Sequence, residues 1–193
     1  MNQRGVGVSS FYIEVSPFMI LPLSKMLKVA RGIDQISIWS GKITAWLILP
    51  LVFGLTYEVI SRYIFKTPTI WAYDLAYMLY GTLFMSGAAF TLFKKGHIRT
   101  DIFYDKWSPK KQGWIDALLY LFFFFPGMIF FLWAGADEAL HSWSILEKSE
   151  VGAWRPPIYP FKTVIPLTAL LLLIQGVSEF LKSVYAAAKG EWP

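Results

Sequence analysis

The stretch WSGKITAWLILPLVFGLTYEVISRYIF, residues 39–65, decides the fold class of this chain. An α-helix rises about 1.5 Å per residue, so a segment of this length can cross the ~30 Å hydrocarbon core of a bilayer. Comparable apolar segments follow at residues 71–93, about 114–136 and about 161–184. We therefore predict an all-α integral membrane protein with four transmembrane helices.

The overall composition agrees with a lipid environment. Of the 193 residues, 55% are hydrophobic and 16% are charged, whereas soluble domains carry about 25% charged residues. Tryptophans stand at or near the span ends, as in the aromatic belts of membrane proteins, at positions 39, 71, 114 and 143. The absence of cysteine excludes disulfides and thiolate-bound metals.

The residues before the first span, 1–38, are expected to form a separate segment. Met1 to Ser10 is polar and lacks the basic start of a signal peptide. From Leu23 to about Trp39, apolar and basic residues fall on opposite halves of a helical wheel. We predict an amphipathic interfacial helix that precedes the four spans, with a simple helical lead-in to the first span as the alternative. The four-helix domain would cover residues 39–185, and residues 186–193 would form a tail.

The distribution of charge predicts the orientation. The net charge is +5, and the basic residues cluster beside apolar segments, which indicates lipid headgroups and not nucleic acid as their partner. The connection between spans two and three is rich in lysine, whereas that between spans three and four is rich in carboxylates. Because basic loops stay inside, both termini are predicted to be cytoplasmic. The second connection holds six cations against two carboxylates: Lys94, Lys95, Arg99, Lys106, Lys110 and Lys111 against Asp101 and Asp105. The third holds two cations against four carboxylates: Lys148 and Arg155 against Asp137, Glu138, Glu147 and Glu150.

Three charged residues lie near the predicted hairpin between spans one and two. Glu58 and Arg62 are four residues apart, and Asp74 follows one turn into span two. We expect Arg62 to pair with Asp74, with Glu58 or with both, because pairing lowers the cost of placing charges near hydrocarbon. Such a pair would fix the hairpin, contact a partner subunit or lie on an ion pathway.

Gln175 is the one long polar side chain well inside span four, and we expect it to form a hydrogen bond between helices. The two histidines, His97 and His141, lie outside the span centres, and no convergent group of His, Asp and Glu is evident. We therefore predict no enzymatic activity, no cofactor and no metal. The small residues 86–89 should let another helix approach span two closely.

Several short motifs, taken in order, resemble one known family over roughly residues 30–187. They are RYIF at 62–65, WAYD at 71–74, GAA at 87–89, GHIRTD at 96–101, WRPPIYPFK at 154–162 and QG at 175–176. Together they resemble the DctQ-like small permease subunit of tripartite ATP-independent periplasmic (TRAP) transporters. Asp74 stands where that family more often has Glu, and the first 24 residues have no clear counterpart.

The resemblance implies a small scaffold subunit, in a bacterial inner membrane, of a sodium-driven importer of an organic acid or related solute. Its partners would be a large DctM-like permease subunit and a periplasmic DctP-like binding protein. Other open readings are a membrane anchor of another complex and a small self-sufficient carrier. We expect structural or partner-contact roles for Glu58, Arg62, Trp71, Asp74, His97, Asp101, Arg155 and Gln175.

Overall fold

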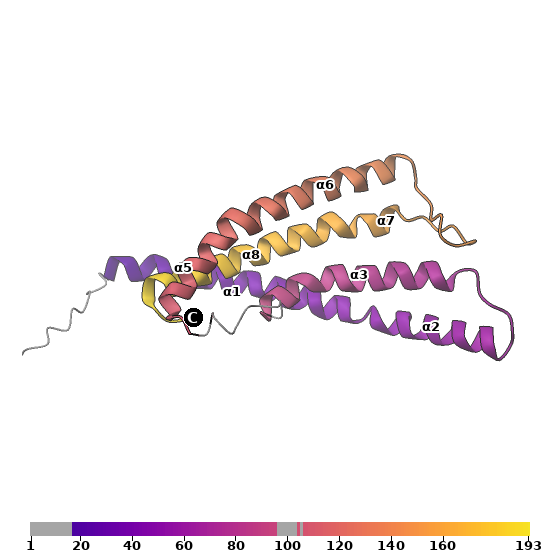
Figure 1. Cartoon of the computed structure of the whole chain (residues 1–193), viewed down its shortest axis with the longest axis horizontal. Coiled ribbons are helices and arrows are strands. Elements are labelled where there is room, and N and C mark those ends of the chain that lie inside the picture. Colours follow the sequence, from indigo (N-terminus) through magenta and orange to yellow (C-terminus); the bar gives the residue numbers. More distant parts are fainter. Residues whose placement is uncertain (1–16, 96–103, 105) are drawn as a thin grey trace, which may run out of the picture.

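The computed structural model describes residues 17–95, 104 and 106–193, with side chains from residue 25 onward. Helices dominate this part of the chain and run alternately up and down a long bundle (Figure 1). They are α1 (Pro17–Ala45), α2 (Ile48–Tyr63), α3 (Ala72–Phe93), α5 (Pro109–Leu119), the π-helix η1 (Tyr120–Phe124), α6 (Phe125–Ser144), α7 (Tyr159–Lys162) and α8 (Val164–Lys189).

Four helical segments are long and apolar enough to cross a membrane, as the sequence predicted. The segment Ala72–Phe93 agrees with the predicted second span almost residue for residue. The other three are longer than expected: Lys25–Tyr63, Pro109–Ser144 and Tyr159–Lys189. Periodicity and hydropathy detect the apolar centre of a helix. They do not detect the polar turns by which the helix extends beyond the hydrocarbon core.

The helix that enters the first span differs from the expectation. The amphipathic segment does not end near Trp39, because α1 continues through Ala45. The break comes at Trp46 and Leu47, where a turn separates α1 from α2. Pro50 explains its position: the proline ring would clash with the carbonyl group four residues earlier, at Trp46, in an uninterrupted helix.

The third span contains a π-helix that the sequence did not reveal. Residues Tyr120–Phe124 widen the helix between α5 and α6. Pro126 follows within two residues, and in a regular α-helix its ring would meet the carbonyl group of Phe122. A single wide turn accommodates such a proline without ending the helix.

Helix α8 is the centre of the bundle, with α1, α3, α5 and α6 packed against it. Its buried face consists of small and polar residues, including Ala169, Ser178 and Ala186. Large side chains point outward instead: Phe53, Phe84 and Trp133 are each more than 70% exposed. This arrangement is typical of helices in lipid, where small residues allow close approach and apolar side chains need no burial from solvent.

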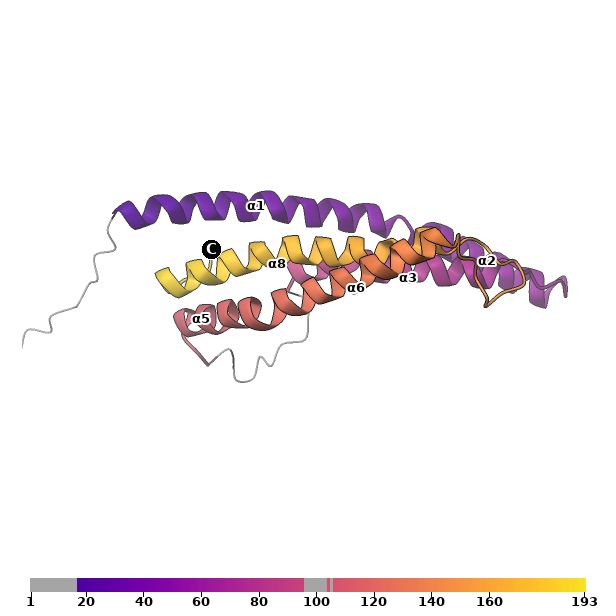
Figure 2. The same ribbon diagram turned by 90° about the horizontal axis from the view of Figure 1, so that it is seen from above.

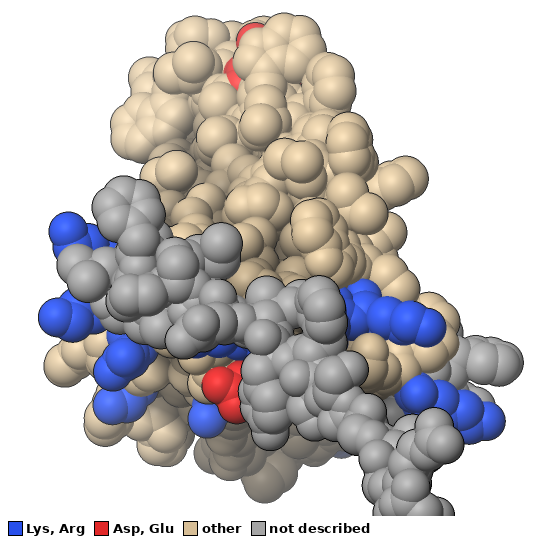
Figure 3. Space-filling view, turned by 90° about the vertical axis from the view of Figure 1, so that its left-hand side faces the viewer, with Lys and Arg blue, Asp and Glu red and all other residues tan. Residues whose placement is uncertain are grey.

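The two ends of the bundle differ in character. At the end where α1 begins and α8 finishes, which we call the basic end, α1, α8 and α5 lie side by side (Figure 2). Lysine and arginine side chains surround this end (Figure 3). At the other, which we call the hairpin end, the α2–α3 hairpin diverges from the α6–α7 hairpin (Figure 1).

Candidate functional site

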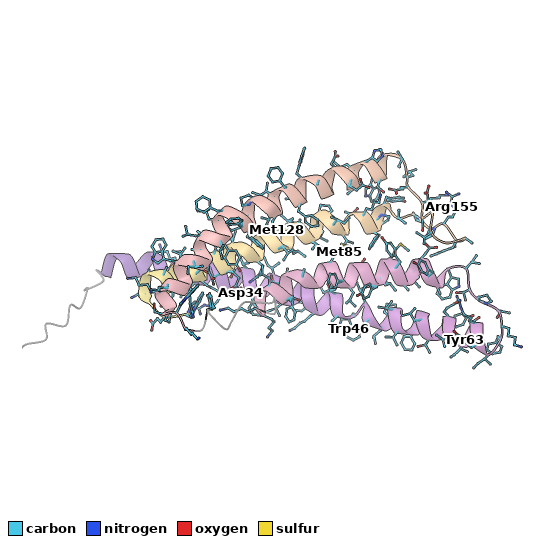
Figure 4. The ribbon with its side chains drawn as sticks, viewed as in Figure 1. Asp34, Trp46, Tyr63, Met85, Met128 and Arg155 are labelled. Carbon is cyan, nitrogen blue, oxygen red and sulfur yellow. The ribbon has the colours of Figure 1, made fainter. Side chains whose placement is uncertain are left out.

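A buried polar cluster joins α1 to α8 on the basic side of the bundle; Figure 4 marks its member Asp34. We call it the Asp34 cluster, and its members are Asp34, Ser37, Gln175, Ser178, Glu179 and Lys182.

Gln175 is fully buried at the centre of this cluster. Its carbonyl oxygen accepts a 2.6 Å hydrogen bond from Ser37 Oγ. Its amide nitrogen donates to Asp34 Oδ1 at 3.0 Å and to Glu179 Oε1 at 3.2 Å. The predicted interhelical hydrogen bond of Gln175 is therefore present, and the residue bonds two carboxylates as well.

Lys182 supplies the counter-charge of the cluster. Its ammonium group lies 3.0 Å from an oxygen of Asp34 and 2.7 Å from Glu179 Oε1. Ser178 Oγ donates a further 2.7 Å bond to Asp34 Oδ1. With these bonds the cluster can hold two carboxylates next to the membrane interior, because buried charges persist only when they are paired and hydrogen-bonded.

The charged members of this cluster, Asp34, Glu179 and Lys182, were not predicted as site residues from the sequence. A signal was available on α8, where residues 175, 179 and 182 recur at helical spacing within an apolar span. On α1, the buried positions are Ala30, Asp34, Ser37 and Thr44, whereas Ile36 from the apolar half of the expected wheel is 49% exposed. The face that α1 buries is thus small and polar, which a search for amphipathicity overlooks.

At the hairpin end, Arg62 pairs with Glu58 and not with Asp74. Arg62 Nε donates a 2.8 Å hydrogen bond to Glu58 Oε1, and the backbone N–H of Thr69 donates to Glu58 Oε2 at 3.0 Å. The Thr69 hydroxyl donates to the same oxygen. Glu58 therefore ties the end of α2 to the turn that leads into α3, as expected for a hairpin-fixing pair.

Asp74 has a different partner from the one that spacing suggested. It is 2% exposed in the first turn of α3, and its Oδ1 accepts a 2.6 Å hydrogen bond from Ser149 Oγ. Gly152 packs so closely on Oδ2 that a Cβ at that position would clash with it. The connection 145–158 folds over the start of α3, which turns Asp74 inward, whereas the Arg62 side chain is 55% exposed on α2.

The same connection is held by Lys162 at the end of α7. Its ammonium group lies 2.6 Å from Glu138 Oε1 of α6 and 2.6 Å from Glu147 Oε2. The bond from Lys162 holds the pKa of the Glu147 carboxyl below its usual value. Arg155, with a positive φ of 48°, donates from Nε to the Ser149 carbonyl oxygen at 3.4 Å. Arg155 thus stabilises the fold of this connection.

Helix α2 leaves a groove along its contact with α3. Trp71 stacks on Tyr57 at 5.7 Å between ring centroids. On the other side of the contact lies a groove of about 430 Å³, lined by Glu58 and Arg62 together with residues of both helices. Three tyrosines of α3 line it, with exposed fractions from 54% to 65%: Tyr73, Tyr77 and Tyr80.

Two expected site residues, His97 and Asp101, lie outside the described residues. Within the described part of the chain, no group of three or more His, Cys, Asp or Glu side chains could hold a metal ion.

A family model described as "Tripartite ATP-independent periplasmic transporters, DctQ component" matches residues 51–185. The match covers more than half of the chain and extends from α2 to most of α8. It includes Glu58, Arg62, Asp74 and the α8 half of the Asp34 cluster, whereas α1 lies outside it. No curated protein matches the chain significantly.

Proposed function

The chain belongs to the DctQ family of tripartite ATP-independent periplasmic transporter components, and from this premise we propose how it works. It is a small permease subunit that acts as a rigid scaffold in a sodium-driven importer of an organic acid or related solute. A large DctM-like subunit carries the substrate and the sodium ions, and a periplasmic DctP-like protein delivers the substrate. The observation that carries this proposal is the family match over the helical domain.

The bonding of the polar groups inside the bundle supports a scaffold role. A carrier needs polar groups that are available to substrate near the midplane. Here, Gln175 is fully buried and bonded to Ser37, Asp34 and Glu179. These groups are engaged in holding α1 to α8, so they favour a fixed arrangement over alternating states.

The α2–α3 groove is the surface that we propose for the large subunit. Within the chain, α2 packs mainly on α3, and Tyr80 lies eight residues inside α3 with 61% of its surface exposed. At about 1.5 Å per residue this is about 12 Å below the start of the helix. Lipid chains offer no hydrogen-bond acceptor to a tyrosine hydroxyl at that depth. A transmembrane helix with polar side chains satisfies it, so the proposed occupant is such a helix of the large subunit.

We further propose that the protein lies in a bacterial inner membrane with both termini in the cytoplasm. The gathering of Lys and Arg at the basic end supports this orientation (Figure 3). The hairpin end, including the connection 145–158 that Asp74 and Lys162 hold in place, then faces the periplasm. It is the surface available to the binding protein.

Uptake into liposomes tests the proposal. We expect the purified chain to move no organic acid under an inward sodium gradient, whereas the complete assembly with its binding protein does so. A panel of radiolabelled organic acids, with potassium replacing sodium as the control, gives the readout. Sodium-dependent uptake by this chain alone would refute the scaffold role, and sodium-independent uptake by the assembly would refute the coupling ion.

A further inference from the structure

Helix α5 lies beside α8 (Figure 2) and buries only the face that it turns toward that helix. Gly113 comes so close to α8 that a Cβ at this position would stand 2.4 Å from the backbone nitrogen of Ala187. Asp116 and Ala117, one turn later, are buried on the same side. The face turned away from α8 is exposed, although α5 begins a segment that is long and apolar enough to cross a membrane.

The residues on this exposed face change in character along the helix. Two exposed cations come first, Lys110 and Lys111. Trp114 follows with 58% of its surface exposed, and Leu118 and Phe122 come next with 47% and 64%. Positions 111, 114 and 118 are three and four residues apart, so they share one side of the helix. From Lys111 to Leu118 the helix rises about 10 Å, which is enough to pass from the lipid headgroups into the hydrocarbon core.

The charge around this face is positive even when every acidic residue near it is counted. Residues 94–111 hold six cations against two carboxylates. Three further carboxylates lie near α5, against one further cation, Lys189. They are those of Asp116, Glu191 and the terminal Pro193, because Asp116 belongs to α5 and Trp192 donates a 2.9 Å hydrogen bond to Gln112. Seven cations therefore face five carboxylates.

The two cations at the start of α5 are also available to an outside partner. Among the described residues, neither Lys110 nor Lys111 has an ion-pair partner. Asp116, the one acidic residue of α5, lies on the buried face and accepts a 2.7 Å hydrogen bond from the Tyr104 hydroxyl. Its carboxylate is therefore turned away from the exposed face that carries the lysines.

We propose that the exposed face of α5 anchors the chain to anionic phospholipids of the leaflet at the basic end. Lys110 and Lys111 contact the phosphate groups, Trp114 lies at the boundary between headgroups and hydrocarbon, and Leu118 contacts the acyl chains. Tryptophan is typical of that boundary, and an anionic membrane surface attracts lysines next to a span. The change from cations through tryptophan to leucine along one helix face follows the change in polarity across a lipid interface. The anchor concerns this chain alone and does not depend on transport.

Native mass spectrometry of the full chain, released from detergent that contains equal amounts of phosphatidylglycerol and phosphatidylcholine, tests the lipid preference. We expect the chain to retain more phosphatidylglycerol. The double variant Lys110→Gln, Lys111→Gln should lower the ratio of the two lipids at least about fivefold, since one cation at an anionic surface contributes about that factor.

The matched control is the double variant Lys66→Gln, Lys148→Gln, which removes two exposed cations at the hairpin end. It should leave the ratio of the two lipids unchanged. An unchanged ratio in the α5 variant would overturn the proposal. Equal losses in the two double variants would also overturn it, because net charge alone would then explain the preference.

Spin labels in liposomes of the same lipids test the depth of the face. The chain has no cysteine, so Lys111→Cys, Trp114→Cys and Leu118→Cys each carry a single label. From position 111 to position 118 we expect accessibility to a water-soluble nickel complex to fall and accessibility to oxygen to rise, because oxygen concentrates in hydrocarbon. Labels that neither reagent reaches, or labels that become inaccessible when the large subunit is added, would assign this face to a protein partner and overturn the proposal.

Discussion

Among the charged residues, Lys182 is expected to contribute strongly to stability. It is the cation that bridges Asp34 and Glu179, and its side chain is 16% exposed. Arg62 offers a contrast, because its side chain is 55% exposed and Glu58 keeps its hydrogen bonds to Thr69 without it. Loss of Lys182 would therefore leave buried carboxylates without a counter-charge, whereas loss of Arg62 would leave Glu58 with its other hydrogen bonds.

Lys182→Met should destabilise the purified chain by about 3 kcal/mol, the lower end of the range for breaking a buried pair, since water reaches the edge of the cluster. Arg62→Ala should cost less than about 1 kcal/mol, as exposed pairs do. Unfolding in mixed detergent micelles measures both. Lys189→Met on the same helix is the control, expected to change stability by less than about 0.5 kcal/mol. Equal losses for Lys182→Met and Lys189→Met would contradict the assigned role.

The residues at the hairpin end show how spacing alone misleads. Asp74 lies close to Arg62 in the sequence, yet it bonds Ser149, which is 75 residues away. The short connection between α2 and α3 brings the two helices together, but it does not determine which face of α3 turns toward α2. The connection 145–158 covers Asp74, and its position depends on the whole bundle.

At the level of helices, prolines mark where the spans start or change geometry. Pro50 and Pro166 each occupy the first turn of a helix, α2 and α8, after a break. Pro126 stands at the start of α6, directly after the π-helix. The first turn tolerates proline because its N–H groups have no partner within the helix. The sequence shows where the prolines stand. It does not show the kind of break that each causes, which is a turn before α2 and a π-helix before α6.

The groove between α2 and α3 yields a prediction for assembly. Replacing both Tyr77 and Tyr80 by Phe removes two hydroxyl groups and leaves the rings in place. We expect the affinity for the large subunit to fall roughly five- to tenfold, since a hydrogen bond between transmembrane helices contributes about 0.6 kcal/mol. Fluorescence energy transfer between labelled subunits in liposomes measures this affinity.

Tyr63→Phe is the matched control for the groove. Tyr63 is 75% exposed at the end of α2, where water can bond its hydroxyl. Its loss should leave the affinity unchanged. An unchanged affinity in the Tyr77 and Tyr80 double variant would place the large subunit on another face.

For the chain as a whole, the charge distribution predicts the orientation in the membrane. Reporter fusions after Lys111 and at the C-terminus should read cytoplasmic, because Lys111 belongs to α5 and both α5 and the C-terminus lie at the basic end (Figure 1). A fusion within residues 147–152, at the hairpin end, should read periplasmic. Paired alkaline phosphatase and fluorescent protein reporters give opposite signals in the two compartments. A periplasmic signal after Lys111 would reverse the proposed orientation.

The fold class and the number of spans follow from the sequence, because crossing a bilayer depends on a local property, a run of about 20 apolar residues. The resemblance to the DctQ family could also be recognised from the sequence, because its motifs are short and follow in order along the chain. The family match confirms it. Gln175 was identifiable as an interhelical contact because a long polar side chain within a span must find a partner in the protein.

The identity of the partners required the packed structure. Asp34 and Ser178 are 144 residues apart, and their contact depends on how α1 and α8 align in rotation and height. In lipid, the face that a helix buries need not be its most apolar face. On α1 that face holds Asp34, Ser37 and Thr44 beside Ala30, and periodicity did not mark the three polar positions as buried. The pairing of Asp34 with α8 and the Ser149 partner of Asp74 both arise from contacts between distant segments, and a local pattern on one helix does not identify the partner on another.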